Sequence, residues 1–160
     1  MKSNTLNTLE KLEDFAQQNH ITVIPYHFDS DRIRGLYCDG TVALSDSIDT
    51  TAEKICILAE ELGHHYTTSG NIIDQARSSN RKQERKARLW AYHRTLDLID
   101  LISAYKYGCR NRYEIADYLE VTECFLQEAL DTYKEKYGMC TTVDKYVVYF
   151  DPLIVLELFS

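Results

Sequence analysis

Two glutamates and a histidine stand close together near the middle of the chain, in the stretch Glu60-Glu61-Leu62-Gly63-His64. This stretch differs by one side chain from the H-E-x-x-H pattern, in which two helical histidines hold a metal and the glutamate acts as general base. Residues four apart on a helix project from one face, so Glu60 and His64 can reach a single cation. Glu61 then lies at the flank, where it can take a proton from a water molecule. The pattern predicts a metal-dependent hydrolytic site.

A catalytic metal site needs a third protein ligand, and Glu84 is the best candidate. It opens the stretch E-R-K-A-R-L-W-A, twenty residues after His64, where the small Ala87 and Ala91 let one helix approach the other closely. The expected metal ligands are therefore Glu60, His64 and Glu84. Two carboxylates and one imidazole form a harder donor set than two imidazoles and one carboxylate. We expect a divalent metal, zinc first, with manganese or ferrous iron as alternatives.

Two other interpretations of the stretch stay open. A frame shifted by one residue, with Glu61 and His65 as ligands, is sterically possible, although it puts Leu62 where the general base belongs. The same residue types also occur on solvent-facing helices that bind nothing. The apolar neighbours Leu58 and Ala59 favour a functional site, because carboxylates beside a packed interior are costly unless they are paired.

Composition limits the classes of protein to consider. A chain of 160 residues suits one domain, or one domain with a small appendage. Its 18 basic and 25 acidic side chains give a net charge of −7, which argues against a general affinity for phosphate backbones. Five cysteines, scattered singly, predict reduced and mostly buried thiols. The N-terminus lacks the apolar core of a signal peptide and no run suits a membrane span, so we expect a cytoplasmic protein.

The elements that must position the site begin with an amphipathic helix expected over residues 5–18. Strand-like runs then predict a small antiparallel sheet over residues 21–45, with a tight turn at Asp39-Gly40. The capping-box spacing of Thr50 and Glu53 predicts that the helix with the chemical residues begins directly afterwards. This helix should bury three aliphatic side chains: Ile55, Leu58 and Leu62.

Further helices are expected in the second half of the chain. One runs from about Asn80 to Tyr105, after a polar connection over residues 71–80, and two shorter ones over residues 111–137 have the apolar spacing of a helix-turn-helix core. The second helix of that pair carries acidic side chains: Glu123, Glu128 and Asp131. A DNA-reading helix normally carries basic or amide groups, so we expect a structural or partner-binding pair and no direct DNA binding. The tail predicts a β segment, a turn at Asp151-Pro152 and an apolar end that packs down.

Several stretches together resemble the ImmA/IrrE family of metallopeptidases carried by phages and mobile elements: C-I-L-A-E-E-L-G-H-H-Y-T-T, E-R-K-A-R-L-W-A, G-C-R-N-R-Y-E-I-A-D-Y-L-E-V-T and Y-F-D-P-L-I-V-L-E-L. The resemblance covers nearly the whole chain. It implies an α+β fold with a minimal zincin-like metallopeptidase core, made of an active-site helix and a small antiparallel sheet, over residues 1–105. A helical, helix-turn-helix-like appendage over residues 106–160 would follow, with its β and apolar tail packing on the core.

The resemblance also implies roles and a substrate. Glu61, His64 and Glu84 match the general base, a metal ligand and the downstream glutamate ligand, whereas Glu60 stands where the first ligating histidine is expected. The implied substrate is a helix-turn-helix repressor of a prophage or mobile element, whose cleavage relieves repression. The alternative is a non-cleaving antirepressor on the same fold, because a carboxylate at position 60 suits weak metal binding better than fast hydrolysis.

Overall fold

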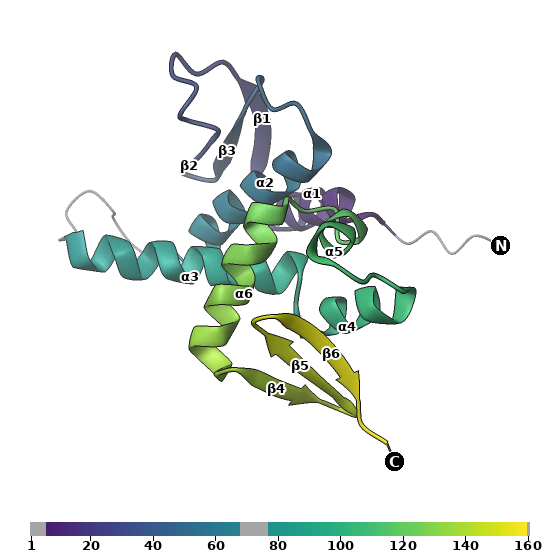
Figure 1. Cartoon of the computed structure of the whole chain (residues 1–160). Coiled ribbons are helices and arrows are strands. Elements are labelled where there is room, and N and C mark those ends of the chain that lie inside the picture. The colour runs from purple at the N-terminus through teal and green to yellow at the C-terminus, as the bar shows by residue number, and fades with distance from the viewer. Residues whose placement is uncertain (1–5, 68–76, 160) are drawn as a thin grey trace. The chain divides into compact units, whose positions relative to one another are not determined.

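The chain folds into a mixture of helices and small sheets, which confirms the expected α+β class (Figure 1). The computed structural model describes residues 6–67 and 77–159. Its helices are α1 (Thr8–Gln18), α2 (Thr51–Thr67), α3 (Arg77–Thr95), α4 (Leu98–Tyr107), α5 (Arg112–Tyr118) and α6 (Glu123–Tyr137). Its strands are β1 (Thr22–Tyr26), β2 (Gly35–Cys38), β3 (Thr41–Ser45), β4 (Cys140–Val143), β5 (Tyr146–Phe150) and β6 (Leu153–Glu157).

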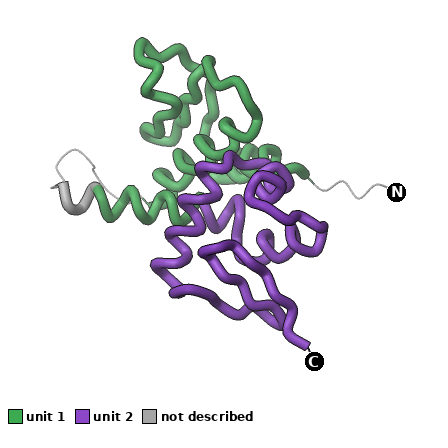
Figure 2. Tube along the Cα trace, in the orientation of Figure 1, with its two compact units in different colours: residues 1–91 green, residues 92–160 purple. Residues whose placement is uncertain are grey.

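The chain divides into two compact units, residues 1–91 and residues 92–160, and the division falls within α3 (Figure 2). The boundary that we expect at residue 105 separates a peptidase core from its appendage, which is a functional division, and it stays a prediction. Each unit contains one sheet and its own helices. The candidate chemical residues all belong to the first unit.

The sheet of the first unit is mixed. β2 and β3 form the expected hairpin, and both turn residues, Asp39 and Gly40, have positive φ. β1, however, pairs with β3 in parallel, which gives the strand order β1-β3-β2. The prediction of an antiparallel sheet over residues 21–45 is therefore wrong for β1. The connection over residues 27–34 carries the chain from β1 at one edge of the sheet to β2 at the other edge, and β3 then pairs between them. The sequence could not predict this, because the alternation of side chains along a strand is the same for parallel and antiparallel pairing.

α2 begins where its capping residue predicts. The Thr50 hydroxyl accepts a hydrogen bond from the Glu53 N–H at 3.2 Å, which satisfies a donor of the first turn. The predicted inward residues are all fully buried: Ile55, Leu58 and Leu62. α2 packs on α1, β2 and β3, while Trp90 of α3 packs against the rings of Phe15 and Tyr66. The helix that carries the candidate chemistry is thus anchored on several sides.

The single helix expected from Asn80 to Tyr105 is in fact two helices, α3 and α4. The prediction is therefore wrong between Thr95 and Leu98, where the helix is interrupted. Asp97 caps α4: its carboxylate accepts a hydrogen bond from the Asp100 N–H, and the Asp100 carboxylate accepts one from the Asp97 N–H, both at 2.9 Å. Such a capping box starts a new helix even where apolar periodicity continues. Of the polar connection expected over residues 71–80, residues 71–76 lie outside the described residues and the rest begins α3.

The second unit contains the predicted helical pair. α5 and α6 meet at Glu120, which has positive φ, and the Thr122 hydroxyl caps α6 by accepting a hydrogen bond from the Phe125 N–H at 3.1 Å. The predicted core residues of the pair are all buried: Ala116, Leu119, Val121, Phe125, Leu126 and Leu130. Tyr133 fixes α6 further, because its buried hydroxyl donates to the Leu96 carbonyl at 3.0 Å. The pair is therefore a packed structural element.

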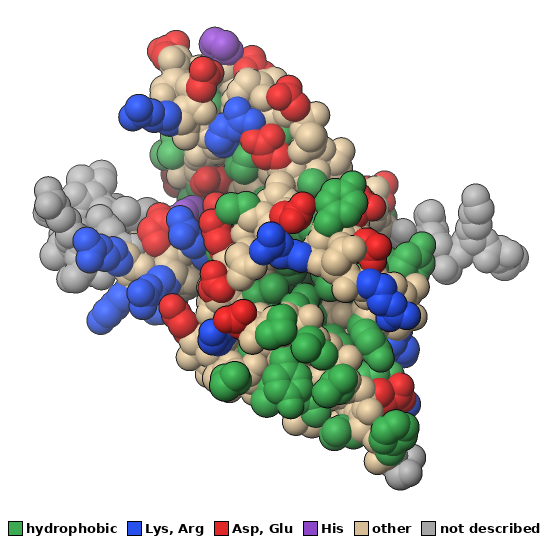
Figure 3. All heavy atoms as spheres, in the orientation of Figure 1, with side chains coloured by type: hydrophobic (Ala, Val, Ile, Leu, Met, Phe, Trp, Pro, Cys, Tyr) green, Lys and Arg blue, Asp and Glu red, His purple; other side chains and the backbone are tan. Residues whose placement is uncertain are grey.

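The C-terminal segment forms more sheet than expected. In addition to the turn at Asp151-Pro152, the chain turns after Asp144, which has positive φ, so that β4, β5 and β6 make an antiparallel sheet. One face packs on α4 and α6 and buries Tyr146, Val148 and Phe150. The other face is apolar and open: Ile154, Leu156 and Leu158 are 43%, 49% and 48% exposed. Figure 3 shows hydrophobic side chains gathered over these strands. The C-terminal sheet therefore packs on α4 and α6 with one face, and its other face stays exposed.

Two predictions from composition have different outcomes. All five cysteines are reduced thiols, but only Cys56 is buried, so the expectation of mostly buried thiols is wrong. Across the described ranges, no helix combines the length and the apolar character that a bilayer crossing requires.

Candidate active site

Glu61 lies on α2 beside the edge strand β2. Its carboxyl group is largely buried and accepts a hydrogen bond from the Tyr37 N–H. Burial raises the pKa of Glu61 to about 7, with smaller contributions from the negative charges of Glu60 and Glu84, while the bond from Tyr37 opposes the rise. A cation beside this carboxyl group would lower its pKa. Glu61 is therefore a fixed carboxyl group whose charge depends strongly on its surroundings.

Gly35 allows β2 to lie this close to Glu61. A Cβ atom at position 35 would lie 2.6 Å from Cγ2 of Ile57 and 3.0 Å from Cγ of Glu61. Real side chains do not occur at the first distance, so the close approach of strand and helix requires glycine. The sequence prediction missed Gly35. A glycine at the start of a strand can signal close backbone approach, but the approaching element is not visible in the sequence.

Tyr37 contacts α2 at a second point. Its hydroxyl oxygen lies 2.7 Å from Nδ1 of His65, and the two rings pack edge to face with centroids 5.3 Å apart. Because Glu61 and His65 are four residues apart, they lie on one face of α2, and Tyr37 meets that face with both its main chain and its side chain. This contact uses Nδ1 of His65, and a metal-binding histidine commonly makes such a bond with its other ring nitrogen, so the contact is compatible with either ligand frame.

His64 and Glu84 meet across α2 and α3. Nε2 of His64 is 3.5 Å from Oε1 of Glu84, and the side chains are 27% and 54% exposed. Two donors bound about 2.0–2.1 Å from a tetrahedral zinc ion lie about 3.3–3.4 Å apart. The pair thus has nearly the spacing of two ligands of one metal ion, and solvent can reach it.

Gly63 sets the distance between these two helices. A Cβ atom on Gly63 would overlap the carbonyl oxygen of Ala87 and would lie 3.0 Å from its carbonyl carbon. The predicted small residues Ala87 and Ala91 are both fully buried. The residue that allows the α3 backbone to approach α2 closely, however, is Gly63. His64 follows Gly63 directly, and Glu84 lies about one turn before Ala87. The backbone contact therefore holds the two donors together.

Glu60 lies half-buried on α2, one turn before His64. Its charge contributes to the raised pKa of Glu61. Among the described residues, no three histidine, cysteine, aspartate or glutamate side chains are grouped so that they could hold a metal ion. The structure thus brings His64 and Glu84 together and does not complete the predicted ligand set with Glu60. Carboxylates around one imidazole carry an excess of negative charge that a hard divalent cation would balance.

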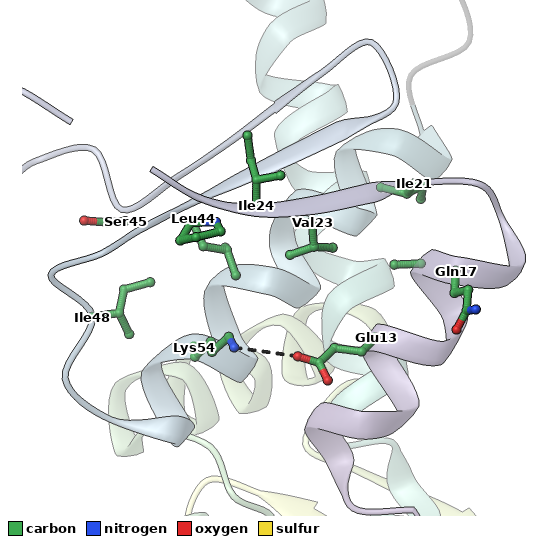
Figure 4. A pocket seen from close by; sticks show the side chains of 11 residues that line it. Glu13, Gln17, Ile21, Val23, Ile24, Leu44, Ser45, Ile48 and Lys54 are labelled. Carbon is green, nitrogen blue, oxygen red and sulfur yellow. Dashed lines mark ion pairs between the residues drawn. The ribbon is translucent and has the colours of Figure 1, made fainter. Parts of the chain in front are cut away.

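A cavity of about 540 Å³ opens beside β1, at the opposite edge of the same sheet (Figure 4). Its walls are mostly aliphatic, and Lys54 and Glu13 form an ion pair of 3.6 Å among its lining residues. None of the candidate chemical residues lines it. Because β2 rather than β1 contacts Glu61, this cavity is separate from the candidate active site.

A largely buried carboxyl group next to a histidine–glutamate pair on two closely approaching helices is the kind of site found in metal-dependent hydrolases. The family comparison agrees: residues 16–131 match the model of the IrrE N-terminal-like domain, Peptidase_M78. The chain belongs to this family, as the resemblance implied, and membership indicates a metallopeptidase-type function that uses a divalent metal. All four candidate residues fall within the matched range. No curated protein and no solved structure matched the chain.

Proposed function

We propose that the protein is a metal-dependent endopeptidase that cleaves a helix-turn-helix repressor of a prophage or mobile element and so relieves repression. The observation that carries the proposal is the joint placement of Glu61, His64 and Glu84 within the family-matched segment. In this proposal, residues 1–105 are a zincin-like core built on α2 and its sheet. Residues 106–160 are the helix-turn-helix-like appendage.

Glu60, His64 and Glu84 would hold the metal, with zinc first and manganese or iron as alternatives. When bound, the metal supplies Lewis acidity to the scissile carbonyl group and to the attacking water. The carboxylate of Glu60 adds a negative charge where a histidine ligand would be neutral, and this extra charge makes the site a weaker Lewis acid.

Glu61 performs the proton transfers. One of its carboxylate oxygens takes a proton from the attacking water while the water oxygen bonds to the carbonyl carbon, and this proton passes to the amide nitrogen as the C–N bond breaks. The water oxygen ends in the new carboxyl group and its proton on the new amine. The Tyr37 N–H holds the carboxylate in place, and Gly35 keeps β2 close enough for that bond.

A non-cleaving antirepressor is the second candidate function. It is favoured by Glu60, because a carboxylate there suits weaker metal binding better than fast hydrolysis. In this case the same fold would bind the repressor and keep it from its operator without cutting it.

The two candidates separate in one experiment on the full chain. The purified protein, loaded with zinc or manganese, is incubated with the repressor encoded beside its gene, and the repressor mass is determined. Cleavage predicts two fragments whose masses sum to the repressor plus one water, formed by wild type and absent with Glu61→Gln. An intact repressor that co-purifies with the chain supports sequestration. An intact repressor that does not bind contradicts both functions.

A further inference from the structure

A second cavity, of about 350 Å³, lies in the other unit between the C-terminal turn of α4 and helix α5. The described residues that line it are tyrosine-rich and acidic, and none of them is lysine or arginine: Tyr107, Gly108, Cys109, Tyr113, Glu114, Asp117 and Tyr118. We call it the tyrosine pocket. None of its residues has a place in the peptidase chemistry proposed above.

The local sequence explains why these side chains face outward together. α5 buries Ile115 and Ala116, so residues 113, 114, 117 and 118 form one continuous exposed face on the opposite side of the helix. α4 ends at Gly108, whose left-handed φ of 113° lets the chain turn sharply. The turn brings the ring of Tyr107 to that of Tyr118, with centroids 4.7 Å apart.

The aromatic walls of the pocket are open to solvent. Tyr107, Tyr113 and Tyr118 are 76%, 66% and 38% exposed. Several large exposed rings around one cavity mark an interaction site more often than an inert surface. The negative face of a tyrosine ring attracts a cation that lies within about 6 Å of its centroid, so the pocket suits a positively charged group.

The charges of the pocket favour the same kind of ligand. Glu114 is fixed beside it, because its carboxylate accepts a hydrogen bond from the Arg110 N–H at 2.6 Å. The pKa of the Cys109 thiol is raised, first by burial and then by the negative charges of Glu114 and Asp117. This field disfavours a thiolate and would favour a cation. The neighbouring Arg112 does not fill the pocket, because its guanidinium binds Glu123 and Gln127 of α6.

We propose that the tyrosine pocket binds the cationic side chain of an arginine or lysine on a basic protein partner. A guanidinium group combines stacking on an aromatic face with hydrogen bonds to a carboxylate, and the pocket offers tyrosine rings next to Asp117. The net charge of −7 favours encounter with a basic partner. The inference goes beyond the peptidase proposal and does not depend on metal or cleavage.

The test is an NMR titration of the full chain with N-acetyl-arginine amide, followed through the tyrosine side-chain resonances. N-acetyl-citrulline amide is the matched neutral probe, and tetramethylammonium tests for a free quaternary amine. The arginine probe should shift the resonances of the tyrosine pocket and the citrulline probe should not. Tyr113→Leu and Asp117→Asn should each weaken binding by about two- to fivefold, the range expected for one exposed cation–π or charge contact.

Matched controls come from the exposed surface of the first unit. Tyr26→Leu and Asp29→Asn remove the same ring and the same charge outside the tyrosine pocket, so they should bind the arginine probe like wild type. The proposal is overturned if citrulline shifts the pocket resonances as strongly as arginine, or if both pocket variants bind like wild type. Tighter binding of tetramethylammonium than of the arginine probe would overturn the assignment to a protein side chain.

Discussion

At the residue scale, Glu61 shows how neighbours turn a common side chain into a candidate general base. Its carboxyl group is largely buried, feels the charges of Glu60 and Glu84, and accepts a hydrogen bond from the Tyr37 N–H. A glutamate exposed on a helix would have the same sequence pattern without these constraints. Burial restricts the geometry of the carboxylate, and the neighbouring negative charges make it easier for the group to take up a proton. Both effects help a general base that takes a proton and later returns it.

Glu61→Gln should abolish most repressor cleavage while metal binding persists. Glutamine has nearly the same shape and can still meet the Tyr37 N–H with its carbonyl oxygen, but it cannot accept the proton. The rate should fall by roughly 10²- to 10⁴-fold, the usual contribution of a positioned general base. Cleavage is followed by fragment mass at matched metal saturation, with the exposed Glu135→Gln as control. If Glu61→Gln cleaves the repressor at the wild-type rate, Glu61 is not the general base.

Glu60 poses a question of metal affinity. Glu60→His would create the H-E-L-G-H stretch, replacing an anionic oxygen donor by a neutral nitrogen that zinc prefers. We expect tighter zinc binding and equal or faster cleavage, whereas His64→Ala should remove most of the affinity. Isothermal calorimetry with zinc and manganese measures both effects. If Glu60→His binds zinc no better than wild type, Glu60 is not a ligand.

At the element scale, the site depends on two close approaches between elements, each of which a glycine allows. β2 reaches α2 at Gly35, and α3 reaches α2 at Gly63. The first contact positions Glu61 and the second brings Glu84 to His64. The helical and strand periodicities predict where these elements lie along the chain, but they contain no information about how closely two of them pack. For that reason the sequence pointed to Ala87 and Ala91 and missed both glycines.

Gly63→Ala tests the contact between α2 and α3. An exposed glycine in a helix interior usually gains about 0.5–1 kcal/mol on replacement by alanine, but here the added methyl group would overlap the Ala87 carbonyl. Overpacking a buried contact typically costs about 1–3 kcal/mol, so the free energy of unfolding should fall. α3 should also shift away from His64 and weaken metal binding.

Urea unfolding and zinc calorimetry give the two measurements for Gly63→Ala. Glu84→Ala is the matched comparison, because it should lose zinc affinity without the overpacking cost. A Gly63→Ala protein that is more stable than wild type and binds zinc equally well would show that the close contact does not position the ligands.

At the scale of the whole molecule, the sequence predicted most elements and the family, but not their connections. Apolar spacing located α2, α5 and α6 because their buried faces are long and regular. The break at Asp97 and the parallel pairing of β1 were missed, since a capping box competes with continuing periodicity and strand direction is set by tertiary packing. The residue types of the site could be predicted from the four-residue spacing, whereas Tyr37 could not, because it meets Glu61 from a distant strand.

The second unit also bears on the choice between DNA and protein as partner. The exposed face of α6 carries Glu123, Glu128 and Asp131. Arg112 and Gln127, the groups best suited to contact phosphates or bases, bind each other at 2.7 Å. The helical pair therefore presents acidic groups where a DNA reader presents basic and amide groups.

We accordingly predict that the full chain does not bind the operator DNA of its proposed repressor substrate. Phosphate contacts are made chiefly by lysine and arginine, and each contributes about 0.9 to the slope of log affinity against log salt concentration. A chain with net charge −7 and an acidic α6 should give no measurable gel shift or anisotropy change between about 50 and 200 mM salt. The repressor is the positive control on the same operator. Tight binding of the chain itself, with a slope steeper than about −3, would mean that several phosphates are contacted and that this unit reads DNA after all.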